Sequence, residues 1–110
     1  MNRYGFSKPE RLLRQSDYHR VFKKGRRVQT KHFTIVFCPN DLNITRLGLV
    51  AGKRIGNAVT RNRVKRLVRE FFRLNKSSFP ESTDVILVAK PSASLLDFWG
   101  VQKDISGHLV

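Results

Sequence analysis

The side chains with the clearest chemistry lie in one stretch, residues 46–74. This stretch carries nine Lys and Arg side chains and a single acid, Glu70. The cations crowd the first half of a predicted helix, where the helix dipole is positive and basic side chains are unfavourable. Free backbone N–H groups at a helix start, together with several arginines, bind phosphate. The pattern therefore favours a site for a phosphate-rich polymer over the alternative, an ordinary solvated helix face.

Hydrolytic chemistry is difficult to assemble from the rest of the sequence. Cutting a phosphodiester needs a carboxylate cluster that holds a metal ion, or a positioned acid and base. The eight acids are scattered, and Glu81 and Asp84 have no third ligand nearby. His19 and His32 could act as an acid–base pair, but nothing in their spacing requires it. We therefore expect no catalytic residue and no metal site in this chain.

Apolar spacing predicts the elements that position the cations. Residues 47–51 form a short strand, and a turn leads into a helix over residues 58–74 with Asn57 as its N-cap. The apolar stripe of this helix comprises Val64, Leu67, Val68, Phe71 and Leu74. The opposite side comprises Asn62, Lys65, Arg66, Arg69 and Arg73, flanked by Arg61 and Arg63. We expect one face in the core and the other against a polyanion.

The run GKRIGNAVTRNRVKRLVRE resembles the signature of the protein subunit of bacterial ribonuclease P. In that signature an Arg-Asn-Arg core follows a Gly-Asn-Ala-Val turn, and here the core is Arg61, Asn62 and Arg63. The resemblance implies a protein that assists a catalytic RNA, which uses Mg²⁺ to remove the 5′ leader from precursor tRNA. It also implies one protein per catalytic RNA. The residues that it assigns to binding that RNA are Lys53, Arg54, Arg61, Asn62, Arg63, Lys65, Arg66 and Arg69.

The resemblance also implies a cleft for the single-stranded leader. In the family, aromatic residues of the first helix border this cleft, and the sheet forms its floor. Tyr18 and Phe22 fall on the aromatic positions, and Val36 falls on a floor position that is aromatic in some relatives. Flat rings stack on bases without sequence preference, at roughly 1–3 kcal/mol per base. From the sequence alone, ordinary core packing is the alternative reading of Tyr18 and Phe22.

The remaining pattern predicts one small α+β domain over residues 1–110, with a central mixed sheet and about three helices. Residues 1–14 are expected to form a basic flexible arm. A first helix is predicted from Ser16 to about Lys24, with Gly25 as its C′ residue. Strands are predicted over 31–38, over 45–51, which includes the strand at 47–51 described above, and over 84–90. A last helix is predicted from Ser92 or Ser94 and places Trp99 in the core. Residues 46–90 form a strand–helix–strand crossover, for which the resemblance implies a left hand against the general rule.

Composition limits the other classes of protein. The net charge is +14, and residues 1–31 and 46–74 each contribute +8, as expected for a nucleic-acid-binding surface. No apolar run approaches the ~20 residues of a membrane span, so we expect no membrane binding and a cytoplasmic location. Cys38 is the only cysteine and is expected to be a buried apolar residue. Two alternatives remain: a structured-RNA binder with no role in cleavage, and a double-stranded DNA binder, which the buried helix stripe disfavours.

Overall fold

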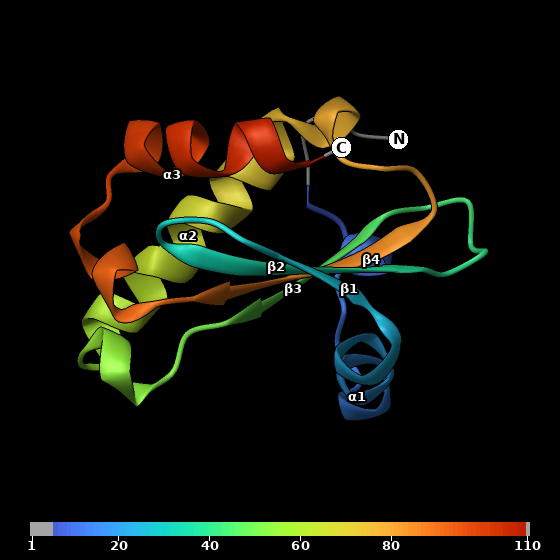
Figure 1. Cartoon of the computed structure of the whole chain (residues 1–110), viewed down its shortest axis with the longest axis horizontal. Coiled ribbons are helices and arrows are strands. Elements are labelled where there is room, and N and C mark those ends of the chain that lie inside the picture. Colours follow the sequence, from blue (N-terminus) through green and yellow to red (C-terminus); the bar gives the residue numbers. More distant parts are fainter. Residues whose placement is uncertain (1–5, 110) are drawn as a thin grey trace.

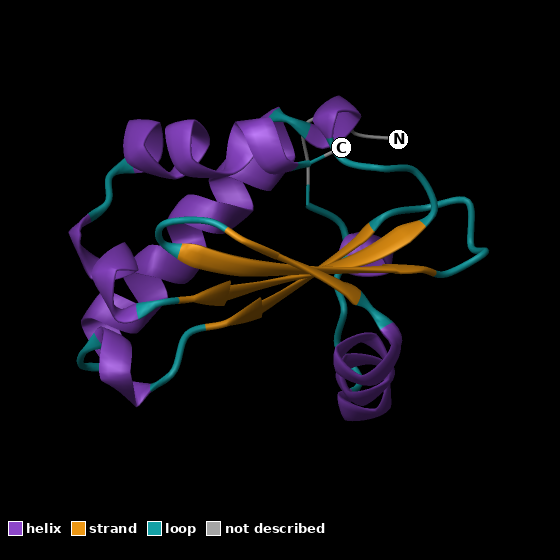
Figure 2. Cartoon of the chain, viewed as in Figure 1, coloured by secondary structure: helices purple, strands orange, loops and turns teal. Residues whose placement is uncertain are grey.

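A four-stranded sheet lies at the centre of the computed structural model, which describes residues 6–109. Figures 1 and 2 show helices on both of its faces. The strands are β1 (Arg26–Gln29), β2 (Phe33–Pro39), β3 (Arg46–Val50) and β4 (Thr83–Ala89). The α-helices are α1 (Gln15–Lys24), α2 (Ala58–Leu74) and α3 (Phe98–Ile105). Short 3-10 turns are η1 (Lys8–Glu10), η2 (Lys53–Ile55), η3 (Lys76–Ser78), η4 (Pro91–Leu95) and η5 (Ser106–His108).

The sheet is mixed, with the strand order β1-β2-β4-β3. Strand β2 pairs antiparallel with both β1 and β4, whereas β3 pairs parallel with β4. Parallel neighbours need a crossover connection, and α2 supplies it. The predicted α+β domain with a strand–helix–strand unit is therefore confirmed, and the left hand of that crossover stays an expectation from the resemblance.

Alternation along β2 divides the core between the two faces of the sheet. Phe33, Ile35 and Phe37 are buried in the cluster that packs against α2 and α3. Val36 and Cys38 point the other way, into a smaller cluster beneath α1. Figure 2 shows α2 and α3 on one side of the sheet and α1 on the other. The strand predicted over 31–38 is confirmed and is apolar on both faces, and Cys38 is buried as expected.

Helix α2 begins where the sequence predicts. The side chain of Asn57 accepts a hydrogen bond from the Thr60 N–H at 3.0 Å, so it is the N-cap. Gly56, just before the cap, has φ of +148°, which only glycine adopts without strain. The buried stripe comprises Val64, Val68, Phe71 and Phe72, while Leu67 is half-buried and Leu74 is exposed. The stripe is thus rotated slightly from the predicted one, toward Phe72.

The N-cap residue of α1 and the backbone conformation at its C-terminal end differ from the prediction. Arg14, not Ser16, is the N-cap, and Gly25 is extended (φ −76°) and not left-handed. Glycine is required there by close packing, because a Cβ on Gly25 would lie 2.6 Å from Cγ1 of Val36. Strand β1, which follows directly, was not predicted, since its sequence RRVQ has one apolar residue.

The last helix starts later than predicted, and this displaces Trp99. The side chain of Asp97 accepts a hydrogen bond from the Gly100 N–H at 2.8 Å and caps α3, so residues 91–95 form η4 instead. Val101 and Ile105 then provide the buried face of α3. Trp99 is 70% exposed, so its predicted place in the core is wrong.

Part of the expected N-terminal arm packs on the sheet. At the outer edge of β3, Arg11 forms an isolated parallel bridge with Leu47, and the Leu12 N–H donates to the Leu47 carbonyl at 2.9 Å. The side chain of Leu12 is buried. Arg3 lies outside the described residues. The apolar pair Leu12 and Leu13 was the available signal that this segment docks.

Candidate nucleic-acid interface

The outward face of α2 carries cations without partners. Arg66 and Arg69 are exposed, and Arg61 and Lys65 are half-buried. Among residues 6–109, none of these four side chains forms a hydrogen bond or ion pair. Asn62 is exposed among them. Since neighbouring like charges repel one another, binding of an anion to this face relieves their repulsion.

The turn η2 adds two exposed cations at the start of the same helix. Lys53 and Arg54 point to solvent, while Ile55 is buried in the main core and fixes the turn. In Figure 1 this turn lies beside the first residues of α2. The structure therefore brings Lys53 and Arg54 to the end of α2 where the helix dipole is positive, as the sequence predicts.

Arg63 has a contact that the sequence did not predict. Its guanidinium donates hydrogen bonds to the Ser94 carbonyl at 3.3 Å and to the Leu96 carbonyl at 2.6 Å. These two carbonyls belong to η4 and the residue that follows it. Arg63 thus connects α2 to the segment that leads into α3, and among residues 6–109 its guanidinium forms no ion pair with a carboxylate.

The cation row ends at an intrahelical ion pair. The Arg73 guanidinium donates to both carboxylate oxygens of Glu70, one turn earlier on α2. The hydrogen bond from Arg73 lowers the pKa of Glu70, although desolvation opposes this shift. The only acid of α2 is therefore paired away from the row, and Arg73, predicted on the polar side, is not one of the free cations.

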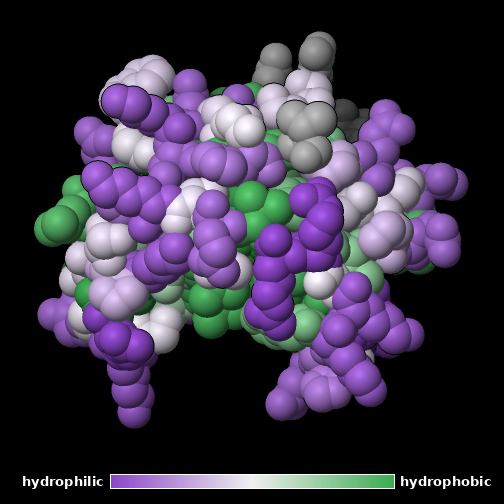
Figure 3. Space-filling view, in the orientation of Figure 1, coloured by the Kyte–Doolittle hydropathy of each residue, from purple (hydrophilic) through white to green (hydrophobic). Residues whose placement is uncertain are grey.

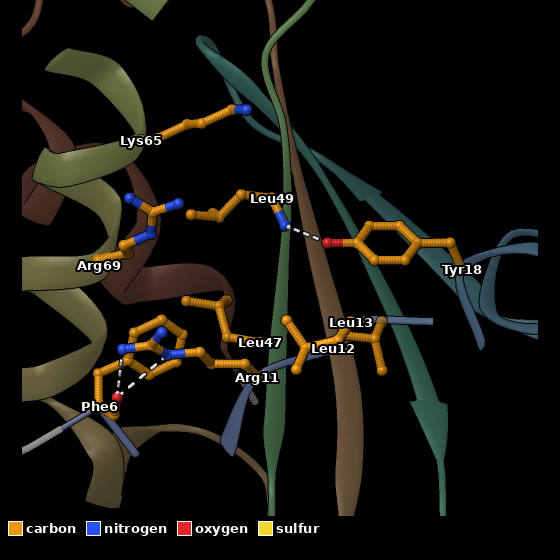
Figure 4. Close-up of a pocket in the computed structure, with 9 residues that line it drawn as sticks. All are labelled: Phe6, Arg11, Leu12, Leu13, Tyr18, Leu47, Leu49, Lys65 and Arg69. Atoms are coloured by element: carbon orange, nitrogen blue, oxygen red, sulfur yellow. Dashed lines mark hydrogen bonds between the residues drawn. The ribbon is translucent and has the colours of Figure 1, made fainter. Parts of the chain in front are cut away.

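A pocket of about 370 Å³ connects α2 with the N-terminal segment. Figure 4 shows Lys65 and Arg69 reaching from α2 toward β3, with Tyr18 on the far side of that strand. Arg11 lines the same pocket, and its guanidinium lies 4.9 Å from the centre of the Phe6 ring. The full lining is Phe6, Arg11, Leu12, Leu13, Tyr18, Leu47, Leu49, Lys65 and Arg69. This pocket therefore brings together cations from the two basic blocks of the sequence, residues 1–31 and 46–74.

The predicted leader-binding residues lie together on the α1 side of the sheet, but with different exposure. Tyr18 and Phe22 are half-buried, and the Tyr18 hydroxyl accepts a hydrogen bond from the Leu49 N–H at 3.1 Å. Val36 is 0% exposed beneath α1. Gly25 and α1 cover Val36, so it offers no surface to a ligand. The prediction that Val36 lies on an accessible cleft floor is therefore wrong.

The accessible floor lies one step further along the strands. Thr34, Val88 and Val50 are aligned across β2, β4 and β3, and all three are half-buried. Figure 3 shows a hollow between α1 and the η2 turn, with hydrophobic residues on its wall. Val88 and Val50 were missed from the sequence. Their signal was alternation: Val88 lies two residues after Ile86, the register partner of Val36, and Val50 pairs with Val88, so both share the α1 face.

Comparisons with known proteins agree on one family. The family model Ribonuclease P matches residues 6–110. The chain belongs to the ribonuclease P protein family. The ribonuclease P protein component of Syntrophus aciditrophicus is 45% identical over 105 residues, covering 96% of this chain and 88% of that protein. The solved ribonuclease P protein of Thermotoga maritima is 35% identical with a TM-score of 0.83, covering 91% and 94% of the two chains. That of Staphylococcus aureus is 33% identical with a TM-score of 0.82, covering 91% of each.

Membership in this family identifies the RNA that the chain binds. The ribonuclease P protein family acts with an RNA subunit in the processing of tRNA 5′ ends, so the chain is a subunit of a ribonucleoprotein and its partner is ribonuclease P RNA. The general structured-RNA binder, considered as an alternative, is not favoured. No helix among residues 6–109 is long and apolar enough to cross a membrane.

Proposed function

We propose that this chain is an accessory subunit of ribonuclease P, whose RNA subunit catalyses hydrolysis of the phosphodiester between the 5′ leader and the mature tRNA. The observation that carries the proposal is the row of cations on α2, Arg61, Lys65, Arg66 and Arg69, which lack partners within residues 6–109. Such a row binds phosphates. It supplies no acid or base for the cleavage itself.

Mg²⁺ belongs to the RNA subunit in this proposal. Among residues 6–109, no group of three or more His, Cys, Asp or Glu side chains is placed to hold a metal ion. The donor set of residues 6–109 therefore does not fit a resident metal site. The cations of α2 and η2 reduce phosphate repulsion between RNA segments, which supports binding of substrate at lower Mg²⁺ concentrations.

The α1 side of the sheet is proposed to contact the single-stranded leader of precursor tRNA. Phe22 and Tyr18 supply partly accessible rings, and Val50 and Val88 supply apolar floor beside them. Rings stack on bases without sequence preference, which suits leaders of varied sequence. The η2 turn lies beside the same hollow (Figure 3), and its cations are suited to bind the phosphates of the leader. Val36 supports this surface from below and is not proposed as a contact.

The test separates the two surfaces by comparing substrates with and without a leader. Phe22→Leu removes the flat ring but keeps an apolar side chain, so it should weaken binding of leadered precursor tRNA to the holoenzyme by about tenfold. It should leave the affinity for leaderless tRNA unchanged. Arg69→Ala should weaken assembly with the catalytic RNA whichever substrate is present. Lys103→Ala, an exposed cation on α3, is the control for loss of one charge.

Equal effects of Phe22→Leu on leadered and leaderless substrates would contradict the assignment of the leader to this face. An effect of Lys103→Ala as large as that of Arg69→Ala would show that overall charge, and not the α2 row, determines RNA affinity. One protein per catalytic RNA is expected in the assembled enzyme, and the mass of the complex measured in solution checks this ratio.

A further inference from the structure

A charged carboxylate is completely buried away from the α2 cations. The side chain of Asp84 is 0% exposed at the start of β4. One oxygen accepts hydrogen bonds at 2.8 Å from Arg46 Nε and from Asn40 Nδ2. The other accepts from Arg46 Nη2 at 2.8 Å and from an Nη2 of Arg20. Among residues 6–109, the donors to this carboxylate therefore come from α1, from β3 and from the residue that follows β2.

The carboxylate stays ionised in this site. Burial alone would raise the pKa of Asp84, but the hydrogen bonds from Arg46, Asn40 and Arg20 outweigh it and lower the pKa below its usual value. Apolar residues of similar size often fill such sites with equal or greater stability. The buried ion pair therefore calls for an explanation in geometry, since hydrogen bonds of charged groups fix direction as well as distance.

Arg20 is the one donor that belongs to α1. Arg46 lies on β3 and Asn40 follows β2, so these two fix Asp84 within the sheet. Arg20 reaches from the helix to the same carboxylate, and its second terminal nitrogen lies 3.2 Å from the Cys38 sulfur. The side chain of Arg20 is 31% exposed. Since the carboxylate and sulfur of the sheet engage both terminal nitrogens of Arg20, this arginine is directed into the fold and not toward an external phosphate.

Asp17 of α1 also lies 3.6 Å from Arg46 of β3, and this longer ion pair remains when Arg20 is replaced. The Arg20 contact lies between two further attachments of α1. Toward the start of the helix, the Tyr18 ring lies over Gly48, where a Cβ would be 2.9 Å from the hydroxyl oxygen. The same hydroxyl accepts the Leu49 N–H at the outer edge of the sheet. After the helix, Gly25 packs directly on Val36. The apolar contact at Gly25 tolerates sliding and rotation, whereas the Tyr18 hydrogen bond and the ion pair with Asp84 both fix direction.

We propose that Arg20 and Asp84 form an anchor that sets the position of α1 across the sheet and so holds Tyr18 and Phe22 where they contact the leader. Arg20 is a positioning residue in this account and touches no RNA. The part that concerns the leader rests on the proposed function above. The part that concerns the position of α1 stands on the contacts of Asp84 alone.

The test uses Arg20→Gln, with Lys23→Gln as its control. Arg20→Gln leaves Asp84 paired with Arg46 and Asn40, so the sheet keeps its buried pair. Lys23 lies on the same helix, is exposed and has no partner among residues 6–109. Both variants lose one positive charge from α1. Arg20→Lys keeps the charge with a single attachment point and should restore part of the effect, which also covers the case in which Arg20→Gln does not fold.

Two readouts are expected to move together. Amide hydrogen exchange at Leu49, whose N–H is held by Tyr18, should become about tenfold faster in Arg20→Gln and stay unchanged in Lys23→Gln, given the free energy of a hydrogen bond to a charged group. The affinity of the holoenzyme for leadered precursor tRNA should fall about tenfold while that for leaderless tRNA is kept.

Unchanged exchange at Leu49 would overturn the anchor itself, whatever the RNA affinities show. Faster exchange with unchanged leader-dependent affinity would show that α1 moves without consequence for the leader, and this also contradicts the proposal. If the wild-type protein shows no dependence on the leader at all, the proposed function fails, and the Leu49 exchange still decides whether the anchor exists. Equal losses in Arg20→Gln and Lys23→Gln would mean that charge alone is responsible.

Discussion

Replacement by alanine is expected to have different effects at two arginines of α2, Arg63 and Arg66, which are three residues apart. Arg63 donates to the Ser94 and Leu96 carbonyls at 3.3 and 2.6 Å. Arg66 is exposed and has no partner within residues 6–109. Arg63→Ala should therefore reduce the free energy of unfolding, whereas Arg66→Ala should leave it unchanged and weaken binding to ribonuclease P RNA.

The size of the Arg63 effect follows from its two contacts. A hydrogen bond that involves a charged group contributes about 1.5–3 kcal/mol when buried, and less where water can replace it. Because Arg63 is only partly buried and one contact is long, we expect Arg63→Ala to lose about 1–2 kcal/mol of unfolding free energy. For Arg66→Ala we expect a change within about 0.5 kcal/mol, as for other exposed surface positions.

Urea unfolding followed by circular dichroism gives both free energies, and titration of the catalytic RNA gives both affinities. Loss of one phosphate contact in Arg66→Ala should also make the salt dependence of RNA affinity shallower, by about one in the slope of log K against log salt. The reasoning fails if Arg63→Ala is as stable as the wild type. It fails equally if Arg66→Ala unfolds more easily while binding RNA normally.

Three further predictions concern the ion pair, the core and the whole surface. Asp84→Asn leaves Arg20 and Arg46 beside a neutral group and should lose about 2–4 kcal/mol at pH 7 in urea unfolding; because the pKa of Asp84 is lowered in the folded state, its contribution is complete above about pH 4 and the gap to wild type should close as the pH falls further. Phe71→Ala, at a residue with 0% exposure, should lose about 3–5 kcal/mol, whereas Trp99→Ala should change stability by less than about 0.5 kcal/mol; similar losses in both would contradict the packing of α3. RNA affinity should fall on the order of 10³–10⁵-fold between 50 and 200 mM salt for a footprint of ~6–10 phosphates, and a flat response would refute the electrostatic account.

The α2 region could be predicted from sequence because its signals are local and agree with one another. Apolar residues at helical spacing gave the buried stripe, and Asn57 gave the start of the helix, which the structure confirms. The cations stood out because they broke the preferences of an isolated helix. Local rules that fail together point to a surface selected for something outside the chain.

Other features could not be predicted because they depend on contacts between distant residues. Arg63 donates hydrogen bonds to two carbonyls in the segment before α3. These contacts depend on how that segment packs against α2, which no local sequence pattern predicts. The exposure of Trp99 followed from a cap at Asp97 that shifted the helix start. Asp84 looked like an unremarkable acid at a strand edge, yet it is the buried partner of Arg20 and Arg46. Strand register, which places Asp84 opposite Arg46, is a long-range property.

The leader-side surface falls between these cases. Tyr18 and Phe22 were predicted on one face of a helix, and both lie half-buried on the α1 side of the sheet. Val36 was expected beside them, but the close approach that Gly25 permits seals it beneath α1. The apolar floor passes instead to Val50 and Val88, so the alternation of the strands was right and the extent of coverage by α1 was not.

The most direct test of the account is cleavage of a 5′-leadered precursor tRNA at low Mg²⁺ concentration. The reaction is run with a bacterial ribonuclease P RNA alone, with this protein alone, and with both together. Efficient release of the leader only when RNA and protein are combined is the predicted result, because the protein supplies binding and the RNA supplies catalysis. Cleavage by the protein alone, after contaminating nucleases are excluded, would contradict the account, as would tight RNA binding that brings no increase in cleavage.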